Sequence, residues 1–340
     1  MKTNQAVHYY KIPVFVPELA CPFRCVYCNQ YDISGVSDVP EAGEVEGLIN
    51  KHLSTMPDNN CHVEVAFFGG NFTGINIIKQ QEYLSVARKF VKAGKIDGIR
   101  VSTRPDYIND EILKNLKIYD VTAIEIGAQS MDDGVLLAAG RGHTSLDVKN
   151  AAGMIIKNNF ELGIQMMTGL PGDTVEKAID TAKRIVELKA DTTRIYPALV
   201  LKNSSLAAMY RDNIYTPQTL EEAVALCAEI FILFEKVGVK VLRMGLHPSE
   251  SFYDGESLLA GPFHPAFGEL VMSKVWNKRI AANIKQNIGE ELKIYVNPTQ
   301  LNQAIGHKSS NKKHFSKSFD KVKYFADRSL KKDQFHVDYR

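Results

Sequence analysis

The sequence lacks any uninterrupted apolar run of the roughly 18 residues that a membrane-spanning helix requires. Its first twenty residues also lack the apolar stretch and small-residue cleavage site that are typical of a secretory signal peptide. Charged residues make up 24% of the 340 positions and hydrophobic residues 45%, which suits a globular enzyme with a sizeable core. We therefore expect a cytoplasmic protein that has no membrane association.

Cysteine is scarce and unevenly placed. The five cysteines are Cys21, Cys25, Cys28, Cys61 and Cys227, so three of them fall within eight positions. An odd number in this arrangement argues against a disulfide framework, and a reducing compartment suits thiolates that must stay free to bind metal. Cys61 begins a predicted strand and Cys227 lies in an apolar helix, so we expect both in the core.

The apolar pattern predicts a strict alternation of strands and helices. The expected strands are residues 11–17, 62–68, 98–103, 121–127, 161–167 and 192–200, with one further strand at 239–246. The expected helices lie near 41–56, 77–94, 110–116, 174–190 and 217–237, with helical segments also before 159. Six strand–helix units predict a parallel sheet covered by helices, which right-handed crossovers bend toward a barrel. We therefore predict an α/β fold, a partial (β/α)6 TIM-like barrel, over residues 1–246.

The pattern changes after residue 246. Residues 247–340 begin with a loop rich in Gly, Pro, His and Ser, followed by a helix near 269–286, and we expect a small α+β C-terminal extension. From residue 274 to 340 there are 15 Lys and Arg against 6 Asp and Glu, a balance of +9 in a chain of net charge +2. Such asymmetry is typical of a region that binds a polyanion, but a solvated basic tail explains it equally well.

Residues that carry chemistry follow the ends of the predicted strands. These segments are 21–29, 68–71, 102–106, 127–130, 169–173 and 197–200. In a barrel of strands and helices all of them lie at one rim, where the loops that follow the strands build the active site. Each segment alone has a plainer explanation: Gly69-Gly70 as a tight turn, Arg104 paired with Asp106 on the surface, Gln129 as a helix cap.

The cysteine loop, Cys21-Pro22-Phe23-Arg24-Cys25-Val26-Tyr27-Cys28, gives the most specific signal. Three thiolates this close can each bind one iron of a [4Fe–4S] cluster, which leaves the fourth iron open. The amine and carboxylate of S-adenosylmethionine can fill that position, and reduction by the cluster then releases a 5′-deoxyadenosyl radical. A zinc site would need a fourth protein ligand, for which His62 and His143 are the alternatives.

The spacing Cys-x3-Cys-x2-Cys, with an aromatic residue before the last cysteine, resembles the signature of the radical S-adenosylmethionine superfamily. The segments 68–73, 102–107, 125–130, 141–144, 166–172 and 194–200 resemble the radical domain of the catalytic subunit of Elongator. They are more distantly similar to oxygen-independent coproporphyrinogen oxidase. The resemblance covers residues 10–245, and it implies a radical enzyme that needs a reductase or flavodoxin-type electron donor.

The resemblance also implies a binding site for S-adenosylmethionine along the rim. The implied cofactor contacts are Tyr27, Gly69, Gly70, Asn71, Ser102, Arg104, Gln129, Arg141, Gln165, Gly169 and Pro171. Within this set Tyr27 lies near the adenine, and Gly69 and Gly70 let backbone oxygens approach the methionine amine. Gln129 and Arg141 match positions near the methionine carboxylate, since an arginine fork suits a carboxylate. Gln165 stands where a related family has a ribose-binding acid.

The substrate is the least defined part of the sequence. Arg243, His247 and Glu250 follow the last predicted strand, and we expect them to contact substrate or transfer protons. The basic tail has Lys312, Lys313 and interleaved aromatic residues, a pattern that could bind tRNA with Phe315 or Tyr324 stacked on a base.

Three functions stay open on the sequence alone: a radical enzyme that modifies tRNA, one that acts on a small metabolite, and a non-catalytic iron–sulfur or RNA-binding protein. The Elongator subunit carries an acetyltransferase domain after its radical domain. We expect no acetyl transfer here, because residues 247–340 are too few for such a domain.

Overall fold

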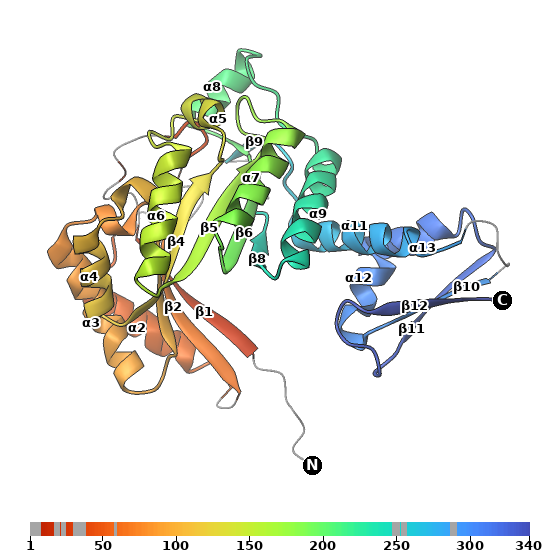
Figure 1. Ribbon diagram of the computed structural model, residues 1–340, viewed down its shortest axis with the longest axis horizontal. Helices are drawn as coiled ribbons and strands as arrows, with labels where there is room; N and C mark the ends of the chain where they lie inside the picture. The colour runs from red at the N-terminus through yellow and green to blue at the C-terminus, as the bar shows by residue number, and fades with distance from the viewer. Residues whose placement is uncertain are drawn as a thin grey trace.

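The computed structural model describes residues 8–16, 21, 25–29, 39–57, 60–246, 252, 257–285 and 291–340. Seven parallel strands form one curled sheet in the order β1-β2-β3-β4-β5-β6-β8 (Figure 1). The strands are β1 (His8–Phe15), β2 (Cys61–Phe68), β3 (Gly98–Thr103), β4 (Val121–Gln129), β5 (Glu161–Thr168), β6 (Thr192–Pro197) and β8 (Lys240–Met244). The expected partial barrel is confirmed. The further strand expected at 239–246 is β8, which forms the edge of the sheet opposite β1.

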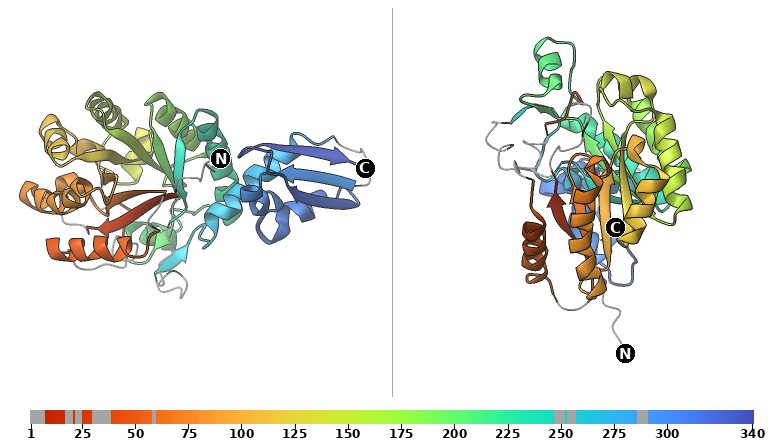
Figure 2. Two further views of the ribbon diagram at one scale, coloured as in Figure 1. Left: turned by 90° about the horizontal axis from the view of Figure 1, so that it is seen from below. Right: turned by 90° about the vertical axis from the view of Figure 1, so that its left-hand side faces the viewer.

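Helices cover the outside of the curled sheet, as the end-on view in Figure 2 shows. They are α2 (Ala42–Leu53), α3 (Ile77–Lys92), α4 (Asp110–Ile118), α5 (Asp133–Ala138), α6 (Ser145–Lys157), α7 (Val175–Glu187) and α9 (Leu220–Lys236). Three of them begin with reciprocal capping boxes: Glu41 with Glu44 in α2, Thr144 with Asp147 in α6 and Thr219 with Glu222 in α9. The expected helix bounds agree with these elements to within a few residues.

Alternation along the strands gives the sheet two different faces. The face toward the helices is apolar and includes Ile12, Val65, Ile99, Ile124 and Ile164, all fully buried in one hydrophobic core. The opposite, concave face carries polar and charged side chains at the alternate positions, namely Lys11, Glu64, Arg100, Ser102, Glu125, Gln165, Arg194 and Tyr196. Strands of parallel sheets are usually apolar on both faces, so this polar concave face is a specific feature of the chain.

Buried ion pairs join the strands across the concave face. The guanidinium of Arg100 donates from Nη2 to Glu161 Oε1 (2.7 Å) and from Nε to Glu64 Oε2 (3.3 Å), and Lys11 pairs with Glu64 as well. Arg194 Nε donates to Glu125 Oε2 at 2.9 Å. These contacts connect β1 with β2, β2 and β5 with β3, and β4 with β6.

The C-terminal part forms a second, smaller core beyond α9. Helix α11 (Phe267–Ala281) packs against α9 and leads to a three-stranded sheet in the order β11-β10-β12 (Figure 1). Its strands are β10 (Glu291–Val296), β11 (Lys321–Ala326) and β12 (Phe335–Tyr339), and α12 (Leu301–Ile305) and α13 (Ser310–Phe315) complete the unit. The fully buried Trp276 of α11 lies at the centre of this core. The expected small α+β extension is confirmed.

A short two-stranded sheet and one helix lie outside the half-barrel sheet. The short strands β7 (Val200–Leu201) and β9 (Leu258–Ala260) pair antiparallel, and helix α8 (Ser205–Arg211) follows β7.

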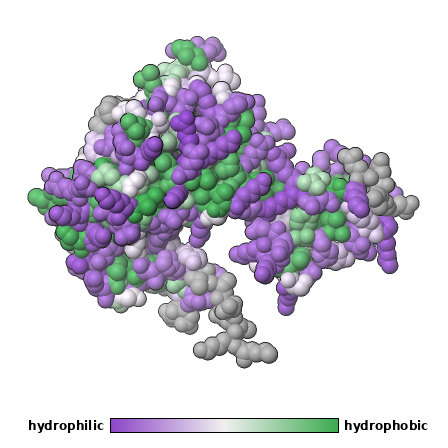
Figure 3. Space-filling model, viewed as in Figure 1, coloured by the Kyte–Doolittle hydropathy of each residue, from purple (hydrophilic) through white to green (hydrophobic). Residues whose placement is uncertain are grey.

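None of the helices in the described ranges is long and apolar enough to cross a membrane. Figure 3 shows hydrophilic residues over most of the visible face, with apolar patches between them.

Two aromatic residues do not lie where the sequence placed them. Phe315 is 3% exposed and belongs to the C-terminal core, and Tyr324 packs against the same core. Neither ring is available to stack on a base. The expectation was wrong because the apolar alternation of β11 points Val322 and Tyr324 toward the helices.

The concave ion network yields a stability prediction. The change Arg100→Met leaves Glu64 and Glu161 without their guanidinium, so we expect the free energy of unfolding to fall by about 3–5 kcal/mol. The matched control, Lys89→Met, removes an exposed ion pair with Glu46 and should cost less than about 1 kcal/mol. Urea unfolding of both variants measures the difference, and equal losses would contradict a structural role for the network.

Candidate active site

The rim segments that the sequence singled out lie at the carboxyl ends of neighbouring parallel strands. Gly69 and Gly70 follow β2, Arg104 follows β3, Gln129 ends β4 and Gly169 follows β5. Because the sheet is parallel and the strands are adjacent in this order, these ends meet at one edge. The rim prediction is therefore confirmed for the position of these residues.

The cysteine loop is anchored to distant parts of the chain at this edge. The backbone N–H of Val26 donates to the carbonyl of Ala139 (3.0 Å), and the carbonyl of Val26 accepts from Leu206 N (2.7 Å). Asn29 Nδ2 donates to the carbonyl of Lys202 at 2.9 Å. The loop is thus attached both to the end of α5 and to the β7–α8 segment.

Arg141 connects the cysteine loop to the sheet. Its Nη1 donates to Cys25 Sγ (3.3 Å) and to the hydroxyl of Tyr27 (3.3 Å), while Nη2 donates to the carbonyl of Gly127 (2.5 Å). Burial acts to lower the pKa of Arg141, but Tyr27 and Cys25 outweigh that effect and raise it, so the guanidinium stays charged.

A second arginine supports the first. Arg104 donates from Nη2 to the carbonyl of Arg141 (2.7 Å) and forms a two-pronged ion pair with Asp106, at 3.0 and 2.9 Å. The pairing with Asp106 that the sequence suggested is correct. Arg104 is however only 2% exposed, so the pair is not on the surface. Its position makes Arg104 a support for the backbone of Arg141.

The glycine pair after β2 allows a close approach of two chain segments. Gly69 has φ +90°, and a Cβ there would lie 2.8 Å from the carbonyl oxygen of Val16. The neighbouring Asn71 is 2% exposed, and its Oδ1 accepts from Thr103 Oγ1 (2.6 Å) and from Arg104 N (3.3 Å). Asn71 therefore ties the loop after β2 to the end of β3.

The end of β4 has an unusual backbone. Gln129 adopts φ +68°, in the left-handed region that a glutamine rarely occupies. Gln165 Nε2 donates to Gln129 Oε1 at 3.1 Å. A Cβ on Gly127 would lie 2.9 Å from Gln129 Nε2, so only glycine leaves room for this arrangement. Gln129 does not act as a helix cap, because α5 is capped by Asp132.

Several buried polar atoms at the rim have no hydrogen-bond partner within the part of the chain that the structure describes. They include Ser102 Oγ, Arg141 Nε, His143 Nδ1 and Asp173 Oδ1. Buried polar groups normally find partners, so atoms of this kind at a rim indicate where a ligand is bound. This observation fits the polar, anionic end of an amino acid such as methionine.

The turn after β5 is held on both sides. Gly169 has φ +73°, its carbonyl accepts from the hydroxyl of Tyr215 (2.6 Å), and its N–H donates to Asp173 Oδ2 (2.8 Å). Pro171 is buried in the same turn. Burial raises the pKa of Asp173 to about 6.

An apolar wall lies beside the cysteine loop. Val26 and Tyr27 pack against two hydrophobic clusters at the rim. The clusters consist of Val135, Ala139, Met167, Leu170 and Ala198, and of Val200, Leu206, Ala207 and Tyr215. A wall of this kind suits the flat face of an aromatic base.

The substrate residues are only partly described. His247 and Glu250 lie outside the described residues. Arg243 lies on β8, paired in register with Arg194, and its Nε donates to the carbonyl of Gly245 at 3.0 Å. Burial lowers the pKa of Arg243, and Arg194 adds to this effect, whereas Tyr196 opposes it.

Among the described residues, neither histidine of the zinc alternative joins the cysteines in a metal site. His62 lies at the amino end of β2, opposite the rim, with its Nδ1 3.7 Å from Asp97 Oδ2. His143 is buried, and burial is the main reason that its pKa falls to about 4. Its Nε2 lies 3.3 Å from the carbonyl of Ala128. In the described ranges no three His, Cys, Asp or Glu side chains converge as a metal site requires. The cysteine ligand set therefore stays a prediction.

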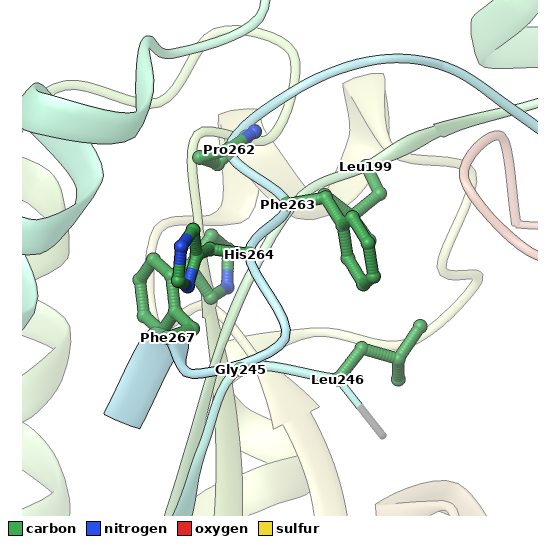
Figure 4. A pocket seen from close by; sticks show the side chains of 8 residues that line it. Leu199, Gly245, Leu246, Pro262, Phe263, His264 and Phe267 are labelled. Carbon is green, nitrogen blue, oxygen red and sulfur yellow. The ribbon is translucent and has the colours of Figure 1, made fainter. Parts of the chain in front are cut away.

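A small pocket lies where β6 and β8 end, and Figure 4 shows its lining. Leu199, Leu246, Phe263 and Phe267 make it largely apolar, and His264 supplies its only imidazole. The Nδ1 of His264 accepts from Ala266 N at 3.0 Å. The pocket extends the rim on the side of β8.

Several site residues were missed by the sequence interpretation. Glu125, Arg194 and Tyr215 form rim or concave-face contacts. The first two begin segments that resemble the family, but the sequence interpretation gave none of the three a role. The signal that could have found the first two is a charge at an alternate position of an otherwise apolar strand. Cys227 is fully buried as expected, whereas Cys61 is only partly buried at the start of β2.

Family comparisons agree with this geometry. The model for the Radical SAM superfamily matches residues 18–185, and the model for the Radical_SAM C-terminal domain matches residues 190–277. The chain belongs to the radical SAM superfamily, whose name refers to S-adenosylmethionine, and it is an enzyme.

Individual relatives refine the comparison. The chain is 24% identical over 252 residues to the tRNA uridine(34) acetyltransferase of Dehalococcoides mccartyi, covering 64% of this chain and 55% of that protein. It is 29% identical over 175 residues to Elongator complex protein 3 of Saccharomyces cerevisiae, covering 51% and 30%. The chain spans about half the length of the tRNA uridine(34) acetyltransferases that it matches.

A solved structure shows the same fold. The archaeal Elp3 of Methanocaldococcus infernus, with an N-terminal deletion, superposes with a TM-score of 0.65 at 19% identity. The superposition covers 81% of this chain and 64% of that one. The resemblance to the Elongator catalytic subunit is confirmed.

The turn after β5 yields a pH prediction. The raised pKa of Asp173 means that the folded protein holds this proton more tightly than the unfolded chain. The stability that it contributes is present below about pH 4 and is lost as the pH rises through about 6. Asp173→Asn lacks this titration. The free energy of unfolding of the wild type, relative to that of Asp173→Asn, should therefore fall by on the order of 2 kcal/mol from about pH 4 to 7. Urea unfolding across this range measures it, and parallel profiles would contradict the assignment.

Proposed function

We propose that this chain binds a [4Fe–4S] cluster through Cys21, Cys25 and Cys28 and uses it to cleave S-adenosylmethionine reductively. The resulting 5′-deoxyadenosyl radical serves to modify tRNA. The observation that carries the proposal is the contact from the buried, charged Arg141 to Cys25 Sγ at the rim of the half-barrel. A reducing cytoplasm suits the thiolates, and a reductase or flavodoxin-type protein supplies the electron.

The chain's own residues fit such a cluster. The loop follows β1, and its residues 25–29 are fixed by backbone contacts to α5 and α8. Arg141 donates a hydrogen bond to one sulfur, and hydrogen bonds to sulfur are a means by which proteins tune a cluster. When bound, the cluster supplies a single electron to the sulfonium of S-adenosylmethionine and an open iron for its amine and carboxylate.

The rim residues divide into two groups in this proposal. The first group surrounds the methionine end and consists of Gly69, Gly70, Ser102, Gln129 and Arg141. In this group Ser102 Oγ and Arg141 Nε have no hydrogen-bond partner among the described residues and can bind polar atoms of the ligand. Asn71 and Arg104 position this group from behind. Their hydrogen bonds go to Thr103, Asp106 and the carbonyl of Arg141.

The adenosine end lies along the apolar wall. Tyr27, Gly169 and Pro171 line it, and Gln165 stands between it and Gln129 on the concave face. The concave face beyond this point is polar and ends at Arg243 on β8, with the segment of His247 and Glu250 following. We assign these three residues to the substrate side, where they contact substrate or transfer protons.

Two observations support tRNA as the substrate. The relatives of this chain include proteins named tRNA uridine(34) acetyltransferase. The region from 274 to 340 carries a balance of +9, which suits a polyanion. A small metabolite would not require this charge.

The cluster ligands can be tested directly. Anaerobically reconstituted protein should hold about four irons per chain. In Cys25→Ala iron content and the visible absorption of the cluster should be lost, because one of three sulfur ligands is missing. Cys61→Ala is the matched control and should keep the wild-type iron content, since Cys61 lies at the opposite end of β2 from the rim. A full cluster in Cys25→Ala would overturn the ligand assignment.

The substrate proposal requires a cellular comparison. We expect nucleoside mass spectrometry of bulk tRNA to show one modified nucleoside that is absent from cells without the gene. Wild-type protein should restore it and Cys25→Ala should not. An unchanged set of tRNA nucleosides, together with a changed metabolite, would favour a small-molecule radical enzyme instead. If neither changes and reduced protein leaves S-adenosylmethionine intact, the chain is a non-catalytic binding protein.

A further inference from the structure

The sheet of the C-terminal unit has one covered face and one open face. Leu292, Ile294 and Val322 are buried against α11, α12 and α13. The alternate positions of β10, β11 and β12 therefore point away from the helices. The register places them in three rows across the sheet. The rows are Lys321 with Glu291 and Arg340, Lys323 with Lys293 and Asp338, and Phe325 with Tyr295 and His336.

The third row consists entirely of rings. Tyr295 stacks on Phe325 with centroids 5.0 Å apart and planes at 21°, and on His336 with centroids 4.5 Å apart and planes at 13°. Phe325 and His336 lie on the two edge strands, and both are exposed. The outer ring face of each is thus at an edge of the sheet, where another flat ring can continue the stack.

The second row places like charges side by side. Lys293 of β10 and Lys323 of β11 are register partners on the open face. Like charges directly opposite each other destabilise a sheet. Lys323 pairs with Glu291 at 2.6 Å, and Lys293 has Asp338 as its register partner on β12. The row therefore presents two lysines next to one another, each with a single carboxylate nearby.

Further cations lie at the end of the sheet that holds the rings. The segment between β11 and β12 contains Arg328, Lys331 and Lys332, all exposed. Rings are thus bordered by lysines on the open face and by this basic segment beyond the strand ends. Aromatic stacking surfaces beside a cationic track are the combination that binds single-stranded nucleic acid.

We propose that this open face binds a single-stranded segment of RNA, with a base stacked on Phe325 or His336 and phosphates beside Lys293 and the basic segment. The identification of that RNA as tRNA rests on the proposed function. The surface lies on the C-terminal unit, to the side of the half-barrel (Figure 1). It therefore grips RNA at a distance from the nucleotide that reacts.

A purely structural role for the rings makes a different prediction. Cross-strand aromatic pairs stabilise sheets, so Phe325 contributes to folding in either case. Leucine keeps an apolar side chain at this exposed position but cannot stack on a base. Phe325→Leu therefore separates RNA binding from folding, provided that its urea unfolding midpoint stays close to that of the wild type.

The experiment measures binding of a short fluorescein-labelled oligouridine to the full chain by fluorescence anisotropy. We expect Phe325→Leu to weaken the affinity about tenfold, in line with the contribution of one stacked base. Lys293→Gln should weaken it and lower the slope of log affinity against log salt by about 0.7, the value for one phosphate contact on a single strand. The matched controls, Tyr210→Leu on α8 and Lys157→Gln on α6, alter an exposed aromatic residue and an exposed lysine outside the C-terminal unit and should bind as the wild type does.

Three outcomes would overturn the inference. They are wild-type affinity in Phe325→Leu, equal losses in Lys293→Gln and Lys157→Gln, and competition by oligoglutamate as effective as that by unlabelled RNA. The last would indicate an acidic protein partner.

The outcome is independent of the radical chemistry. Cys25→Ala should bind the oligonucleotide as the wild type does, because the open face contains no cysteine. If Cys25→Ala binds normally while tRNA nucleosides are unaffected by loss of the gene, the surface stands and the proposed function fails. If cells without the gene lack the modified nucleoside but Phe325→Leu binds the oligonucleotide normally, the proposed function stands and the proposed RNA-binding surface is wrong.

Discussion

One buried guanidinium, that of Arg141, joins the cysteine loop to the rim of the half-barrel. Arg141 holds the sulfur of Cys25, the hydroxyl of Tyr27 and the carbonyl of Gly127 at once, and so joins the cysteine loop after β1 to the end of β4. Arg104 fixes the backbone of Arg141 from the end of β3. Breaking these contacts would separate the loop that carries the proposed cluster ligands from the rim that would hold S-adenosylmethionine.

The polar concave face follows from the alternation of side chains along the strands. Each strand directs its apolar residues to the helices and its charged residues inward, where Arg100 and Arg194 pair with carboxylates of neighbouring strands. Charges buried this way cost desolvation and are maintained only when they are paired. They make the concave interior next to the rim polar.

The alternation of strands and helices was enough to predict the half-barrel, because the period of apolar residues differs between the two elements. The rim was also predictable, since parallel strands all end at one edge. Sequence failed where contacts are long-range: nothing local shows that Arg141 reaches Cys25 across 116 positions, or that Tyr215 holds Gly169. It failed too for Phe315 of α13 and Tyr324 of β11, because both rings pack into the core between the small sheet and its helices.

The central claim is that the cysteine loop and the rim form one site that cleaves S-adenosylmethionine. The most direct measurement is the amount of 5′-deoxyadenosine formed when anaerobically reconstituted, dithionite-reduced protein is mixed with S-adenosylmethionine. The account predicts 5′-deoxyadenosine and methionine in equal amounts in the wild type and Cys61→Ala, and a sharp fall in Arg141→Met with iron retained. Intact S-adenosylmethionine in the presence of a full, reduced cluster would contradict the account.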